Sequence, residues 1–272
     1  MQLIRVFGLL LATTTLTACL NSTTLVRLKP DGSGTVEQLT LVNTAALKGM
    51  MPGGAKQTEG PVINRDDLER TAQRMGKGVR LVSAEKATGE NGFEGTKAIF
   101  AFDDINEIQI NQDPNMSGGT SGRLATAPTS DDPVKFKLTR GASTSTLTIN
   151  YIDKPSEAQT ASRTAPSPAG GDMPDLTNPM IMNMLKTMFQ GFKINIALEV
   201  VGSIVKTNAE YVSGPRITLL EMDVVQLLSD EAKLKELQGK LGPDASLSQV
   251  KPYLKDMKGI KIDGPSISVE FR

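Results

Sequence analysis

The sequence predicts an α+β fold: a twisted antiparallel β-sheet with several packed helices and two long disordered insertions. Segments in which apolar and polar residues alternate recur along the whole chain, as in strands that bury one face. Segments with helical spacing and recognisable caps lie between them. With 272 residues, the chain is long enough to bury a sizeable core.

The first two strands are expected at 22–30 and 35–43. They flank Asp31-Gly32-Ser33-Gly34, whose residue types supply the positive φ angles of a tight hairpin turn. A helix should follow from Asn64, an N-cap residue, to Gly76, which can end it.

The middle of the chain combines strands with polar insertions. Strands are expected at 79–86 and 94–102, followed by the insertion 111–132, in which 16 of 22 residues are Gly, Pro, Ser, Thr, Asn or Asp. The alternating segment 133–152 reads as a hairpin, and a second flexible insertion is expected at 153–177. Because two strands alone are marginal in water, this hairpin should join a sheet made by segments on either side. A single domain is therefore favoured over two separate ones.

The last third of the sequence is expected to form both helices and strands. A methionine-rich helix is expected at 178–190, and strands at 192–201, 204–211 and 216–222 should pair with one another. Helices at 224–228 and 230–241, and one after a capping box at Ser246 and Gln249, precede a last strand at 266–271. The predicted core includes Phe136, Leu147, Ile149, Ile194, Ile196, Leu198, Ile217, Leu219, Ile267 and Val269.

The N-terminus resembles a bacterial lipoprotein signal. An apolar stretch follows Arg5 and is too short to cross a bilayer, which needs about 20 apolar residues. It ends in Leu16-Thr17-Ala18-Cys19, which resembles a lipobox, and Cys19 is the only cysteine. The alternative is an ordinary secreted protein with a chance cysteine near the cleavage site.

This resemblance implies cleavage between Ala18 and Cys19 and acylation of Cys19, so that the chain is held at a membrane. Residues 1–18 are then the signal peptide, and 19–272 form a single extracytoplasmic α+β domain. Leu20 after the cysteine favours the outer membrane facing the periplasm over the inner membrane.

The composition argues against several classes of function. The chain has no histidine, which removes the usual general base and the commonest metal ligand. Loss of Arg5 with the signal leaves 29 of the 30 basic side chains against 30 acidic ones, and this balance argues against nucleic-acid binding. We expect no cofactor and no metal.

Local motifs point to structure rather than to catalysis. The Ser-x-x-Lys matches at Ser83 and Ser203 fall on predicted strands, where residues three apart face opposite sides. The segment 113–118 begins like a calcium loop, but Leu124 stands where a bidentate Glu is required. The acidic residues 103, 104 and 107 fit a turn or helix start better than a metal site.

The methionine-rich helix is the most unusual local feature. Met180, Met184 and Met188 form one stripe, Met182 points elsewhere, and Phe189 widens the apolar surface. Three interpretations are open: core packing, a lid over an apolar ligand or lipid, and a Cu(I) site. We take Met180, Met184, Met188 and Phe189 as candidate contacts of an apolar ligand.

Two stretches resemble LppM-type surface lipoproteins. One is the hairpin 24–42 with its Asp31-Gly32-Ser33-Gly34 turn, and the other is the Gly202-x-Ile204-Val205 segment, followed by Asn208, Gly214 and Ile217-Thr218. The resemblance implies a mixed α/β domain behind a lipid anchor, in a family to which binding of lipids or glycolipids has been attributed.

These observations favour a lipid-anchored envelope lipoprotein that binds an apolar ligand, a lipid or an envelope protein without catalysis. A scaffold of an envelope complex and a histidine-independent hydrolase are the alternatives.

Overall fold

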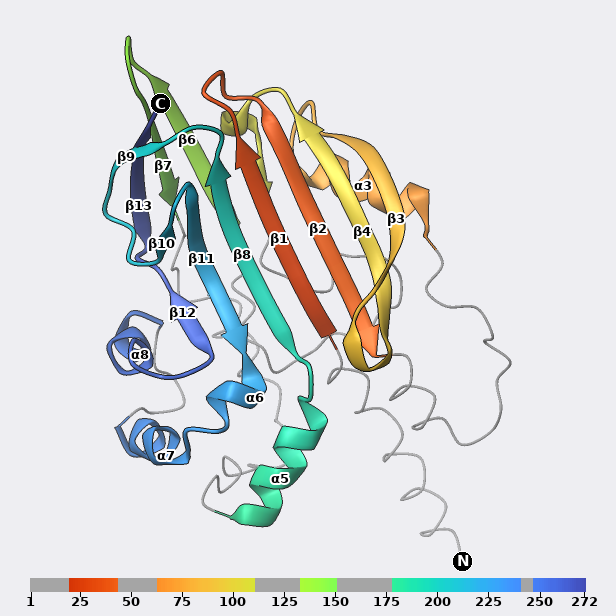
Figure 1. Cartoon of the computed structure of the whole chain (residues 1–272), viewed down its shortest axis with the longest axis vertical. Helices are drawn as coiled ribbons and strands as arrows, with labels where there is room; N and C mark the ends of the chain where they lie inside the picture. Colours follow the sequence, from red (N-terminus) through yellow and green to blue (C-terminus); the bar gives the residue numbers. More distant parts are fainter. Residues whose placement is uncertain (1–19, 44–62, 111–132, 151–177, 241–246) are drawn as a thin grey trace, which may run out of the picture.

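The computed structural model describes residues 20–43, 63–110, 133–150, 178–240 and 247–272, arranged as Figure 1 shows. They form an α+β fold with two β-sheets, which confirms the predicted fold class. The predicted signal peptide 1–18, Cys19 and the insertions 111–132 and 153–177 lie outside the described residues.

The larger sheet has eight strands in the order β10-β11-β8-β1-β2-β4-β3, with β12 paired to β11. Its strands are β1 (Leu20–Leu28), β2 (Gly34–Asn43), β3 (Arg80–Thr88), β4 (Phe93–Phe102), β8 (Lys193–Val200), β10 (Val212–Ser213), β11 (Arg216–Asp223) and β12 (Ile260–Ile262). Neighbouring strands are antiparallel except for β1 and β8, which run parallel with Asn21 opposite Lys193. The parallel pair departs from the antiparallel sheet that the sequence predicts. The partner of β1 opposite β2 is β8, which lies far away in the chain, so no hairpin turn forces the two strands to run antiparallel.

The predicted opening hairpin is confirmed as β1 and β2. Its turn is closed by Asp31, whose side chain accepts hydrogen bonds from the backbone N–H and the hydroxyl of Ser33 at 2.9 and 2.7 Å. Gly32 takes a φ of 86°, which favours glycine. These local bonds fix the register, so that Leu20 lies opposite Val42 at the other end of the hairpin.

The smaller sheet has the order β5-β6-β7-β13-β9. Its strands are β5 (Gln109–Ile110), β6 (Val134–Arg140), β7 (Ser145–Asn150), β9 (Ile204–Thr207) and β13 (Ser266–Phe271). The hairpin β6–β7 thus joins strands from both sides of it in the sequence, as predicted.

One predicted pairing is wrong: β9 leaves the larger sheet and pairs with β13 instead of β8. The chain leaves the larger sheet at Gly202. Glycine is needed there, because a side chain would be strained at its φ of 139° and a Cβ would lie 2.1 Å from the carbonyl oxygen of Arg272. The backbone N–H of Ser203 then donates to that same carbonyl at 2.8 Å. The close approach directs the chain into the second sheet.

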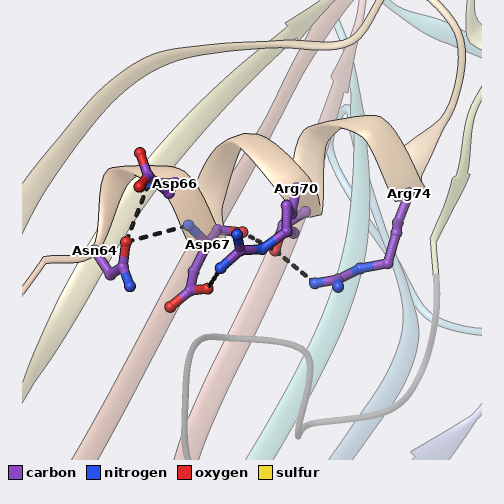
Figure 2. A network of polar contacts seen from close by, with 6 residues as sticks. Asn64, Asp66, Asp67, Arg70 and Arg74 are labelled. Carbon is purple, nitrogen blue, oxygen red and sulfur yellow. Dashed lines mark hydrogen bonds and ion pairs between the residues drawn. The ribbon is translucent and has the colours of Figure 1, made fainter.

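The main core lies between the two sheets and the helix α3 (Arg65–Met75), and all ten core residues predicted above are buried in it. Figure 2 shows the start of α3, where the side chain of Asn64 accepts hydrogen bonds from the backbone N–H groups of Asp66 and Asp67 at 3.1 and 3.3 Å. Arg70 pairs with Asp67 on the outer side. These bonds confirm Asn64 as the predicted N-cap of the helix.

A second, smaller core lies where the remaining helices meet. These helices are α5 (Pro179–Met188), α6 (Val224–Leu227), α7 (Glu231–Lys240) and α8 (Leu247–Leu254). In Figure 1, α5 lies below the start of β8, α6 follows the end of β11, and α8 lies beside β12 with α7 below it. The buried residues of this smaller core are Met182, Leu228, Leu234, Leu254, Met257 and Ile260. Within the described residues, no helix combines the length and the apolar character needed to cross a membrane.

Candidate functional site

The methionine-rich helix α5 is set by local capping. Asn178 precedes it, and its side chain accepts a hydrogen bond from the backbone N–H of Met180 at 2.9 Å. Pro179 occupies the first turn, where its missing N–H costs nothing. At the other end Gly191, with a φ of 81°, turns the chain into β8. The helix is therefore connected to the larger sheet by only four residues.

One face of α5 packs against the other helices. Met182 is only 2% exposed and belongs to the smaller core, with Leu185 packed beside it. Lys186 forms an ion pair of 3.0 Å with Glu231 at the start of α7. Lys186 is the single charged residue of α5, and this pair directs it towards the protein.

The opposite face of α5 is exposed and carries no charge. Met180 is 80% exposed and Met184 is 56% exposed. Asn183 and Thr187 are also exposed, and the four positions share one side of a helix. Single exposed apolar side chains are ordinary on protein surfaces, but two methionines on one uncharged face form a small apolar strip.

The structure therefore changes the interpretation of the methionine stripe. Core packing is wrong for Met180 and Met184, and it is Met182 that enters a core, because α6, α7 and α8 cover only its side of the helix. The side chain of Met188 lies outside the described residues. Phe189 is half-buried, packs against both cores and makes an edge-on contact with Phe192, with ring centroids 6.0 Å apart. Phe189 thus joins the end of α5 to both cores.

The position of α5 relates it to the start of the chain. β1 begins at Leu20, the residue directly after Cys19, and Asn21 lies opposite Lys193, the first residue of β8. The helix α5 leads into that same end of β8, as Figure 1 shows. The exposed strip and the first residue of β1 therefore lie at one end of the larger sheet. We define this as the α5 end of the molecule.

Charged groups at the α5 end are paired with one another. The carboxylate of Asp223 lies 3.0 Å from the ammonium group of Lys193 and accepts a hydrogen bond from the backbone N–H of Gln226 at 3.1 Å. Burial alone would raise the pKa of Asp223, but these two donors outweigh it and lower the pKa. Asp223 is thereby the N-cap of α6 and holds it against β11.

A second ionic cluster crosses the middle of the larger sheet. Arg27 lies 3.0 Å from Glu37 and 3.3 Å from Glu199, and Lys97 lies 3.3 Å from Glu37. Burial alone would raise the pKa of Glu37, but the hydrogen bonds from Arg27 and Lys97 lower it by more than burial raises it. The net shift of the Glu37 pKa is therefore downward. The lowered pKa keeps Glu37 ionised, and the cluster links strands β8, β1, β2 and β4.

Two of the remaining sequence motifs, at Ser83 and at Asp104, have structural explanations. Ser83 lies opposite Ile99 and Lys86 lies opposite Thr96, and residues three apart on a strand face opposite sides, so the two side chains are separated by the sheet. Asp104 caps the short helix η2 (Ile105–Glu107) by accepting from the backbone N–H of Asn106 at 3.0 Å. The described ranges contain no group of three or more His, Cys, Asp or Glu placed to hold a metal ion. The calcium-like segment 113–118 and Leu124 lie outside them.

A small hollow of about 160 Å³ lies between α7 and α8, away from the methionine strip. Its lining is mostly polar: Lys233, Glu236, Pro252, Tyr253 and Asp256. Its volume is below the roughly 300–1,000 Å³ of typical ligand pockets. We assign it no role in ligand binding.

Comparisons with known proteins add little. No protein-family model matches the chain, and no curated protein matches it either. Among solved structures, it is similar to the folded domain of LppM from Mycobacterium tuberculosis, determined by NMR. The match covers 93% of this chain and 90% of that one, with 11% sequence identity and a TM-score of 0.35. LppM belongs to the family that two stretches of the sequence resemble, and a likeness of this size carries neither a function nor a ligand to this chain.

Proposed function

We propose that the chain is a lipid-anchored envelope lipoprotein whose folded body is a binding module without catalytic activity. The observation that carries this proposal is the exposed, uncharged strip of Met180 and Met184 at the α5 end, the end of the larger sheet at which β1 begins. The lipobox-like sequence supplies the anchor, and the strip supplies a surface for an apolar ligand, a lipid or an envelope protein.

The ionisation of the carboxylates supports binding over hydrolysis. A general acid or base at neutral pH needs a carboxyl pKa raised towards 7. In the described residues, each carboxyl group with a resolved shift has a lowered pKa, namely Asp31, Glu37, Glu210 and Asp223. These groups are engaged as ion-pair or hydrogen-bond partners instead.

A scaffold role is the second candidate, because exposed valines lie on two edge strands. Val205 on β9 is 52% exposed and Val212 on β10 is 42% exposed. Edge strands offer unpaired backbone groups to a partner protein. This surface is separate from the α5 strip, so the two candidates can be tested independently.

The anchor is tested by growing cells with labelled fatty acid. We expect the wild-type protein to carry the label on an N-terminal peptide that begins at Cys19. The Cys19→Ser variant should carry none. If the protein is anchored in the outer membrane of a cell with two membranes, it should be recovered in the outer-membrane fraction. An unlabelled wild-type protein with a free thiol at Cys19 would overturn the anchor.

The binding surface is tested with a photoreactive amino acid placed at Met184 or Val205 in living cells. The binding proposal expects adducts at 184 with a lipid, an apolar small molecule or one envelope protein. The scaffold role expects a discrete protein adduct at 205. An anchored protein that gives no adduct at 184 contradicts the role of the strip.

A further inference from the structure

The apolar strip and the predicted anchor lie at the same end of the molecule, and together they determine how the body sits on a membrane. We propose that Met180 and Met184 insert into the headgroup region of the same bilayer that holds acylated Cys19. The α5 end then faces the membrane and forms a second contact beside the lipid anchor. This inference rests on the proposed lipid anchor and names the partner of the strip.

The connection between anchor and body is short. Leu20 is already in β1 and pairs with Val42 of β2, so the sheet begins one residue after Cys19. Adjacent strands lie about 4.8 Å apart, which places the chain at Lys193 close to Asn21. From Lys193 back to Met188 the chain spans at most about 17 Å, and the helical rise to Met184 adds about 6 Å. These steps sum to about 28 Å from Asn21, and the two residues back to Cys19 add about 7 Å, so Met184 lies within about 35 Å of the anchor point.

The chemistry of the exposed face suits the boundary between headgroups and acyl chains. Met180, Asn183, Met184 and Thr187 include no charge, so insertion requires no desolvation of an ion. Lys186 is directed to Glu231 and does not oppose insertion. A helix of ten residues is too short to cross a bilayer but long enough to lie in its interface. Methionine adapts to irregular surroundings, as a lipid surface requires.

The test places a reporter on the strip of the full, lipidated protein. Acylated Cys19 has no free thiol, so a cysteine introduced by Met184→Cys is the only reactive thiol of the chain. It is labelled with a polarity-sensitive fluorophore, and the protein is reconstituted into vesicles of phosphatidylethanolamine and phosphatidylglycerol. The matched control is Val201→Cys, because Val201 is 50% exposed and follows the last residue of β8, at the opposite end of that strand.

We expect a blue shift of the label at 184 and its quenching by nitroxide-labelled lipid, with neither effect at 201. Circular dichroism checks that both variants keep the wild-type fold. Equal, water-like signals at 184 and 201 on protein that floats with the vesicles would overturn the membrane contact and leave the anchor intact. A blue shift without lipid quenching, together with a doubled molecular mass, would overturn it in favour of a second copy. Protein that does not float with the vesicles and keeps a free thiol at Cys19 would refute the anchor itself.

Discussion

The assignment of one buried and one exposed methionine to α5 leads to a direct test by substitution. Met182→Ala removes a side chain that is 2% exposed and touches the smaller core, whereas Met184→Ala removes one that is 56% exposed. Both changes introduce the same residue into the same helix, so the change in helix propensity is the same. The difference between the two variants therefore measures packing alone.

The expected magnitude follows from burial. Burying a methionine side chain stabilises a protein by about 1.5–3 kcal/mol, and the cavity left by its removal adds to the loss. Among the residues whose burial the structure describes, the smaller core has six buried members, and a core of this size can partly collapse around the cavity. We expect Met182→Ala to lower the free energy of unfolding by about 2–3 kcal/mol, near the lower limit for Met→Ala. Met184→Ala should stay within about 0.5 kcal/mol of the wild type.

Urea unfolding followed by circular dichroism gives the global values, and amide hydrogen exchange shows where the loss occurs. Because the smaller core is separate from the main one, part of the effect should appear as faster exchange in α5 and α8 with little change in β1 and β8. A Met184→Ala variant that is destabilised as much as Met182→Ala would refute the assignment of the two faces.

Three further substitutions test individual elements. Gly214→Ala should destabilise the protein by about 1 kcal/mol, and Gly202→Ala by more. Of these two positions, only 202 would bring the new Cβ against a carbonyl oxygen, 2.1 Å away. Urea midpoints and amide exchange in β9 and β13 measure the difference. Asn64→Ala should cost about 1 kcal/mol through loss of the α3 cap, measured by urea unfolding. The pKa of Asp223 is lowered in the folded protein, so its contribution to stability is present above its ordinary pKa of 3.8 and is lost as the pH falls through the folded value. Asp223→Asn should therefore flatten the decline of the urea midpoint between pH 5 and pH 2, and a decline as steep as that of the wild type would contradict the role of the Lys193 pair.

Local patterns in the sequence were sufficient for most single elements. The alternation in β6, β7 and β8 identified the large apolar residues that each strand buries, because the side that faces the core depends on the period of two; it did not identify the buried Ser145 and Ala197. The Asn64 cap and the Asp31 turn were equally clear, since their hydrogen bonds join residues two or three positions apart.

Pairings between distant segments could not be predicted in the same way. The parallel contact of β1 with β8 and the move of β9 to β13 depend on the path of the whole chain. The short strand β12 has only three residues, too few for a visible alternation. The face of α5 that is buried was also missed, because it is decided by residues distant in the sequence: Leu228 directly after α6, Leu234 of α7 and Leu254 of α8.

The direct connection between Cys19 and β1 gives the last prediction. If α5 meets the membrane because the anchor holds the sheet end against it, a flexible spacer should weaken that contact without affecting acylation. Inserting about 12 Gly and Ser residues between Cys19 and Leu20 adds a tether with a root-mean-square length of about 20 Å. The strip would then have to stay inserted by its own affinity, at a lower effective concentration.

Fatty-acid attachment should be unchanged in the spacer variant, while lipid quenching of a label at 184 should fall towards the value seen at 201. A spacer of the same length placed between Gly214 and Pro215, in the tight turn between β10 and β11, is a matched control for the insertion itself, provided that its circular dichroism equals that of the wild type. Quenching at 184 that is unaffected by the N-terminal spacer would contradict the argument, because it would mean that the closeness of anchor and helix contributes nothing to the contact.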